Sequence, residues 1–290
     1  MFRWIVLVGI SIAMFGNYYI YDAISPLADV LVRQLNFTDS DIGLLQGIYS
    51  VPNFFMVLIG GFIIDRLGTK RSTFIFAVLC LIGSVITALS DTLVPMAAGR
   101  LVFGLGAESL IVAVTTAIAK WFKGKELSFA FGINLTIARL GSFAALNSPS
   151  WAASSYEHWR GPLLISVVFG VVCVVGAIVY WILEGSAEKK YQVGAAGAAD
   201  KVVLKDIFKF GTSYWYIVAL CITFYSAIFP FQTFAVKFFI EAHGTSRQLG
   251  GFLISVLTAC TIFGTPAFGL FADKVGRRAT LMVLGAVLLV

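Results

Sequence analysis

Long apolar runs separated by short polar segments dominate the sequence. A run of about 20 apolar residues is long enough to cross the hydrocarbon core of a bilayer as an α-helix. Eight such runs predict eight spans, at about residues 4–30, 42–64, 72–90, 95–118, 127–148, 161–183, 213–240 and 249–271, and a ninth begins near Ala279. The pattern therefore predicts an all-α protein that crosses a membrane several times.

The composition excludes several other classes of protein. Hydrophobic residues make up 59% of the chain, charged residues only 12%, and the mean hydropathy is +0.91. A water-soluble domain carries roughly 25% charged residues, so this chain has too few to cover a soluble enzyme or a nucleic-acid-binding domain. The four cysteines lie within apolar runs and show no metal-ligand spacing. We expect no enzymatic activity, no cofactor and no metal site.

The basic residues predict the orientation of the spans. With the N-terminus placed in the cytoplasm, fifteen of the 21 lysines and arginines fall on the cytoplasmic side. Only Arg33, Arg160, Lys237 and Arg247 fall on the opposite side, and two more lie within spans. By the positive-inside rule, the net charge of +6 is a sign of membrane orientation and does not indicate a nucleic-acid partner.

One polar stretch divides the chain. Residues 185–211 hold a run of glycine and alanine flanked by lysines, which is typical of a flexible linker. We therefore expect a six-helix bundle over residues 1–184, a cytoplasmic linker over 185–211, and the start of a second bundle over 212–290.

A loop motif occurs twice, at a constant offset, between the second and third spans of each half. Its first glycine would allow close helix contact, its acid could meet a helix end or a basic residue, and its basic run would lie at the lipid headgroups. The motif residues are Gly61, Asp65, Arg66, Gly68, Lys70 and Arg71 in the first copy and Gly269, Asp273, Lys274, Gly276, Arg277 and Arg278 in the second.

This double motif resembles the loop signature of the major facilitator superfamily. The resemblance implies two pseudo-symmetric six-helix bundles around a central cavity, each made of inverted three-helix repeats. It also implies twelve helices, so we expect this chain to be a C-terminally incomplete member whose second bundle stops early in its third helix.

Four ionisable residues stand out within the predicted spans: Asp22, Arg100, Glu108 and Arg139. Each costs several kcal/mol there unless it is paired or hydrated, so each is a functional candidate. Glu108 and Arg139 lie at similar depth, and one fixed anion with one fixed cation suits a zwitterion. Alternatively, they form an ion pair that only bridges two helices. Asp22 and Arg100, nearer the outer surface, form either a gating ion pair or substrate contacts.

A second resemblance narrows the family. The segments 99–110, 121–127 and 138–142 resemble the lysosomal dipeptide uniporters of the superfamily, as do 21–22, 229–231 and 237–239. The resemblance implies transport of dipeptides, with Glu108 at the peptide amine and Arg139 at the terminal carboxylate. Tyr18, Tyr21 and Tyr225 are expected either to add hydroxyl groups to the cavity or to pack, and Lys237 either to contact the ligand or to anchor its helix at the interface.

The expected mechanism is alternating access, in which two bundles rock about a central site while the loop motifs stabilise one orientation. Gly104 and Gly106 should allow close helix approach. The alternatives are a proton-coupled transporter or antiporter of another small organic solute, and a receptor or assembly subunit with a transporter fold. The resemblance implies an accessory luminal subunit as a possible partner. Only two residues precede Arg3, which favours the cell (inner) membrane over the lysosomal membrane, although residues 36–38 form a glycosylation sequon.

Overall fold

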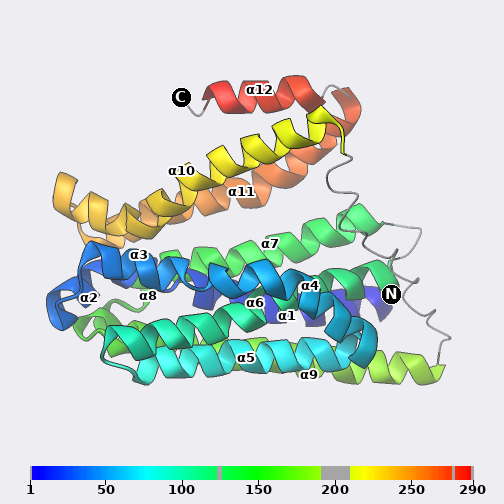
Figure 1. The fold of residues 1–290 in the computed structure, drawn as a ribbon, viewed down its shortest axis with the longest axis horizontal. Helices are drawn as coiled ribbons and strands as arrows, with labels where there is room; N and C mark the ends of the chain where they lie inside the picture. Colours follow the sequence, from blue (N-terminus) through cyan, green and yellow to red (C-terminus); the bar gives the residue numbers. More distant parts are fainter. Residues whose placement is uncertain (1, 123–125, 191–209, 276–277, 289–290) are drawn as a thin grey trace.

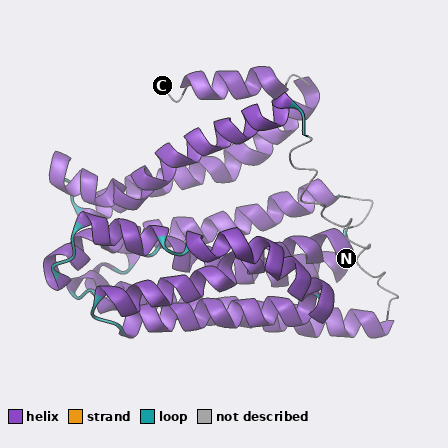
Figure 2. Cartoon of the chain, in the orientation of Figure 1, coloured by secondary structure: helices purple, strands orange, loops and turns teal. Residues whose placement is uncertain are grey.

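The computed structural model describes residues 2–122, 126–190, 210–275 and 278–288, and every regular element in these residues is a helix (Figure 2). Eight helical segments in this part of the chain are long and apolar enough to cross a membrane, which confirms the predicted spans. The elements are α1 (Phe2–Asp22), η1 (Ser25–Leu27), α2 (Ala28–Leu35), α3 (Asp39–Gly47), α4 (Ser50–Leu67), α5 (Thr69–Leu89), α6 (Leu93–Trp121), α7 (Leu127–Leu146), α8 (Ser148–Trp151), η2 (Ala153–Glu157), α9 (Arg160–Lys190), α10 (Thr212–His243), α11 (Arg247–Val275) and α12 (Arg278–Leu288).

The first two spans are each broken near the same end. In the first, Pro26 lies within η1, between α1 and α2. In the second, Pro52 has no N–H to donate to the carbonyl of Ile48, and the N–H of Val51 bonds that carbonyl instead at 3.1 Å. The break separates α3 from α4 and leaves Tyr49 between them. These breaks free backbone carbonyl groups inside the protein, and those groups need partners.

The first six spans pack into one bundle. Helix α5 lies against α6 and α9, and α1 lies against α7 and α9. Close approach depends on glycines, as predicted for Gly104 and Gly106. A Cβ atom at Gly106 would lie 2.6 Å from the carbonyl oxygen of Phe76, and one at Gly104 would lie 2.8 Å from Pro52 Cγ. Membrane helices that meet through glycine gain van der Waals contact between their backbones.

Helices α10 and α11 pair with each other and meet the bundle mainly at one end. Helix α10 meets η1, α2 and α3, helix α11 meets α7 and α8, and both diverge from the bundle toward the end that carries the N-terminus (Figure 1). Thr233, Ala235, Val236 and Lys237 of α10 are buried, whereas almost every residue of 212–227 is exposed. The two halves of the chain, which are the first bundle and the segment that begins with α10, therefore touch at the end near α2 and α3.

The predicted linker overlaps the end of α9. This helix runs to Lys190, past the expected linker start at residue 185, because helix growth is cooperative and need not stop at the membrane surface. The remainder of the expected linker, 191–209, lies outside the described residues. Helix α12 begins at Arg278, where the ninth span was predicted.

Candidate functional site

A cavity of about 110 Å³ lies between the first bundle and α10. It brings together four of the predicted site residues: Glu108 from α6, Arg139 from α7, and Tyr18 and Tyr21 from α1. The other lining residues are Asn17, Tyr49, Phe103, Ala107, Ile111 and Phe229. Helices α1, α6 and α7 thus present charged groups and hydroxyl groups to one cavity.

Glu108 has one polar neighbour in the described structure. The side-chain amide of Asn53, in α4, donates a hydrogen bond of 3.2 Å to Glu108 Oε1. This bond fixes the direction of the carboxyl group. The sequence analysis missed Asn53, although an amide within an apolar span is a signal of the same kind as a buried charge.

Arg139 lines the cavity, and the buried carboxyl group of Asp22 lies near enough to interact with its charge without forming a direct ion pair in the described structure. Its guanidinium lies 5.5 Å from the centre of the Tyr18 ring, in a cation–π contact. Within the described residues, none of the ion pairs joins Arg139 to Glu108. The alternative in which these two residues only bridge helices is therefore wrong for this conformation.

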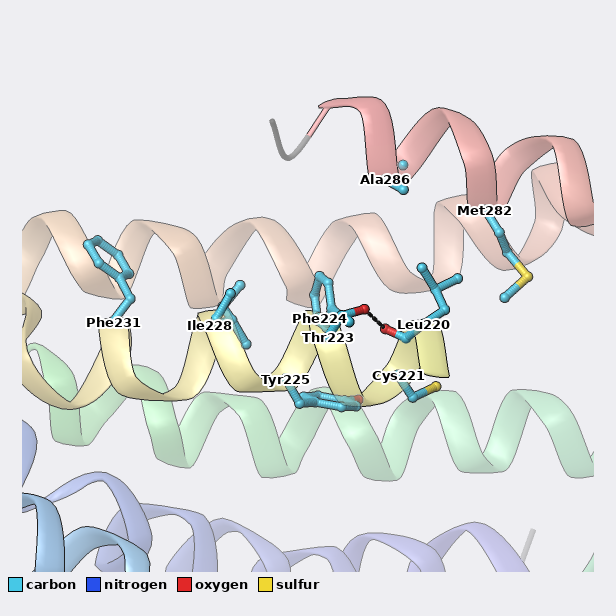
Figure 3. A pocket seen from close by; sticks show the side chains of 11 residues that line it. Leu220, Cys221, Thr223, Phe224, Tyr225, Ile228, Phe231, Met282 and Ala286 are labelled. Carbon is cyan, nitrogen blue, oxygen red and sulfur yellow. Dashed lines mark hydrogen bonds between the residues drawn. The ribbon is translucent and has the colours of Figure 1, made fainter. Parts of the chain in front are cut away.

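The aromatic wall of the cavity differs from the prediction. Tyr21 meets Tyr49 edge to face, with ring centres 4.9 Å apart. Tyr225 does not line this cavity; its ring stacks on Phe229 at 5.0 Å, and Phe229 lines it instead. Tyr225 belongs to a separate cavity of about 690 Å³ between α10 and α12, whose wall is mostly apolar (Figure 3).

Arg100 does not pair with Asp22. Both side chains are buried, yet neither takes part in an ion pair within the described residues. Instead the Arg100 guanidinium donates to the carbonyl oxygens of Ile20 at 3.1 Å and Leu45 at 3.0 Å. It also donates to the carbonyl oxygen of Tyr21 at 3.3 Å and to Gln46 Oε1 at 3.1 Å.

These bonds correct the gating interpretation of Arg100. Ile20 and Tyr21 lie in the last turn of α1, and Leu45 lies in the last turn of α3, where helical carbonyl groups lack N–H partners. A cation also opposes the partial negative charge of a helix C-terminus. Arg100 therefore joins the broken ends of the first two spans, next to the cavity wall.

Two ion pairs link the halves at the end where they converge. Lys237 of α10 pairs with Asp39 of α3, and Arg247 of α11 bonds Asp29 of α2, with Nε 3.3 Å from Oδ1. The hydroxyl of Ser25 also donates to the carbonyl oxygen of Gln232. The sequence pointed to Lys237 alone. Its partner could not be found there, because it lies 198 positions away.

The first loop motif is placed differently from its expected role. Asp65, Arg66 and Arg71 are exposed, as is Gly68, whose φ of 80° suits a glycine between α4 and α5. A Cβ atom at Gly61 would meet nothing within 4 Å, whereas one at Gly60 would lie 2.9 Å from Ser109 Oγ. Gly60 therefore provides the close contact expected of Gly61.

The structure describes less of the remaining motif residues. Lys70 is half-buried at the start of α5. In the second copy, Gly276 and Arg277 lie outside the described residues. Only the helical backbone is described for the others, which are Gly269, Asp273, Lys274 and Arg278.

Comparison with known proteins identifies the family of this chain. The sequence model described as Major Facilitator Superfamily matches residues 10–290. The chain is 32% identical over 298 residues to the "Lysosomal dipeptide transporter MFSD1" of Danio rerio, covering 98% of the chain and 65% of that protein. It is 33% identical over 289 residues to the protein of the same name from Homo sapiens, covering 95% and 62%. The chain thus spans a little under two thirds of these relatives.

A solved structure gives the same fold. A bacterial homolog to the human lysosomal transporter Spinster, in an inward-facing and unoccupied conformation, matches with a TM-score of 0.71. The match covers 96% of this chain and 64% of that one, at 18% identity. At that identity the likeness establishes the arrangement of helices.

Proposed function

Because the chain belongs to the major facilitator superfamily, we propose that it moves dipeptides across a membrane by alternating access. Glu108 receives the peptide amine and Arg139 receives the terminal carboxylate. The name of its relatives from Danio rerio and Homo sapiens, lysosomal dipeptide transporter, supports this substrate class.

The observation that carries the proposal is the pair of opposite, unpaired charges on one cavity. Glu108 and Arg139 both line it, and within the described residues no ion pair joins them. Two such charges are costly inside a membrane protein unless a ligand or water neutralises them. A dipeptide carries one ammonium and one carboxylate, so it neutralises both at once through charge-assisted hydrogen bonds. The bound site is then neutral without a coupled ion, which supports uniport.

The conformation supports alternating access. Ion pairs hold the halves together near α2 and α3, and the halves separate toward the N-terminus. The positive-inside rule places that end in the cytoplasm. We assign the structure to an inward-facing state, in which residues 1–184 and 212–290 are the moving bundles and 185–211 connects them.

A binding experiment on the full-length protein tests both charge assignments. Dissociation constants are measured by calorimetry for a dipeptide and for two blocked forms, one acetylated at the amine and one amidated at the carboxylate. In the native protein each block should weaken binding by about tenfold or more, the value of a charge-assisted hydrogen bond. Glu108→Gln should remove the effect of acetylation alone, and Arg139→Gln the effect of amidation alone.

Matched variants control for loss of charge elsewhere. Glu157, at the end of η2, and Arg160, at the start of α9, are exposed and do not line the charged cavity. The variants Glu157→Gln and Arg160→Gln should therefore bind dipeptides as the native protein does. The proposal fails if the native protein binds no dipeptide. The charge assignment fails if Glu108→Gln and Arg139→Gln weaken the free and both blocked peptides equally.

A further inference from the structure

A second cavity adjoins the charged one. It is an open cavity of about 200 Å³ between α10 and the junction of α3 with α4. Tyr21, Tyr49 and Phe229 line both cavities, which are therefore adjacent. A ligand held between Glu108 and Arg139 therefore lies directly beside this second space.

The charged cavity alone is small for a dipeptide. Its volume of about 110 Å³ is below the roughly 300–1,000 Å³ that is typical of small-molecule sites. Its charged groups account for the two ends of the peptide, but the peptide side chains need room of their own. The second cavity has the larger volume and lies beside the three aromatic residues that the two cavities share.

Two glycines create the second cavity. Gly43 and Gly47 lie four residues apart on α3, so they share one face of that helix, and both line the cavity. A Cβ atom at Gly47 would meet nothing within 4 Å, and the nearest atom to one at Gly43 would be Phe234 Cζ, at 4.0 Å. Neither glycine is needed for helix contact or for an unusual backbone angle. The missing side chains leave open space.

The lining of this cavity favours an uncharged occupant. None of its lining residues, all of them in the described part of the chain, carries a formal charge. The amide of Gln46 already accepts from Arg100 at 3.1 Å and donates to the carbonyl oxygen of Tyr21 at 3.4 Å. The hydroxyl of Thr233 donates to the carbonyl oxygen of Phe229 at 2.9 Å. A charged side chain would find no counter-ion here.

We propose that the Gly43–Gly47 face of α3 forms a side-chain subsite, which receives one uncharged side chain of the bound peptide and limits its size. This inference rests on the proposed function, because it needs the peptide ends held at Glu108 and Arg139. Aliphatic and aromatic side chains gain by burial there, and a charged side chain is rejected.

The test compares peptides that differ only in side chain. Binding of diglycine, leucyl-glycine, glycyl-leucine, lysyl-glycine and glycyl-lysine is measured by calorimetry to the full-length protein and to Gly47→Leu. In the native protein one leucine peptide should bind about tenfold more tightly than its lysine counterpart. Gly47→Leu, which fills the cavity, should weaken that leucine peptide by about tenfold and leave diglycine within about twofold.

A matched variant separates the subsite from a general effect. A Cβ atom at Gly132 of α7 would also meet nothing within 4 Å, and Gly132 lines neither cavity, so Gly132→Leu should bind all five peptides as the native protein does. If Gly47→Leu weakens diglycine as much as the leucine peptides, or weakens none, the subsite is overturned while dipeptide binding stands. If the native protein binds none of the five, the proposed function is overturned with it.

Discussion

Lys237 of α10 forms an ion pair with Asp39, the first residue of α3, and so joins the two halves of the chain. The Lys237 side chain is 10% exposed and that of Asp39 is 63% exposed. Arg247 and Asp29 form a second such pair, and their side chains are 17% and 8% exposed. Both pairs lie where the halves converge, so they stabilise the conformation in which this end is closed.

Lys237→Gln should shift the conformational equilibrium modestly toward opening of this end. Because Asp39 is well exposed, solvent screens the pair, and we expect a change of about fivefold or less in the ratio of the two conformations. Spin labels at the exposed positions Phe62 and Tyr216, near the opposite end, would report it as a shift in their distance distribution. Exchanging the charges, Lys237→Asp with Asp39→Lys, should restore the native distribution; an unchanged distribution in Lys237→Gln would mean that the pair does not hold the halves.

Arg247→Gln should have a larger effect on the same measurement. Asp29 is buried and the Arg247 side chain is only 17% exposed, so solvent screens this pair less. The change leaves Asp29 with a single cation, Arg33, whose side chain is 65% exposed. We expect a shift of roughly tenfold or more in the conformational ratio. Arg33→Gln is the control. Arg33 also pairs with the Asp29 carboxylate, at 2.6 Å, but both residues belong to α2, so this pair does not join the two halves. Equal effects of the two variants would show that the charge balance of Asp29, and not the link between halves, governs the equilibrium.

Arg100→Leu should destabilise the protein without acting through substrate. The change leaves the carbonyl groups of Ile20 and Leu45 buried without the donor that Arg100 supplies, and each unsatisfied group costs about 1–3 kcal/mol. The melting temperature of the purified protein should fall steeply, and Arg100→Lys should restore only part of it because ammonium cannot reproduce the planar fork. A stable Arg100→Leu protein that fails to bind dipeptides would instead support a direct contact with substrate.

Gly83→Ala should destabilise the contact between α5 and α6. A Cβ atom there would lie 2.7 Å from the carbonyl oxygen of Gly99, which belongs to a rigid helix backbone. We expect a loss of about 1–3 kcal/mol in the free energy of unfolding, as for other overpacked contacts. Gly61→Ala is the matched change at an open position, and it should leave the melting temperature unchanged or slightly raised. A fall in Gly61→Ala as large as that in Gly83→Ala would contradict this assignment of the glycines.

Much of the fold could be predicted from the sequence, because the limits of a membrane span depend on local properties. Hydropathy and length placed all eight spans, and the start of α12 agrees with the expected ninth span. The breaks after Asp22 and Gly47 were missed, since an apolar run stays apolar across a proline. They matter for function, because the second break places Tyr49 in the wall of both cavities.

The candidate site was predictable in part. A charge within an apolar span is visible in the sequence, and the cost of burying it singled out Glu108 and Arg139 before any contact was known. Whether such a charge faces a cavity or a backbone depends on the rotation of its helix. Arg100 was singled out by the same rule, yet it bonds carbonyl oxygens at broken helix ends.

The sequence by itself determined that the chain crosses a membrane in helices, that charges such as Arg100 and Glu108 fall within its spans, and the family to which it belongs, because hydropathy and motif spacing are properties of neighbouring residues. Only the tertiary structure decided which groups meet. Lys237 pairs with Asp39, Glu108 accepts from Asn53, and Arg139 lies over the Tyr18 ring. These contacts join separate helices, and the rotation and depth at which helices pack follow from side-chain fit along their whole length.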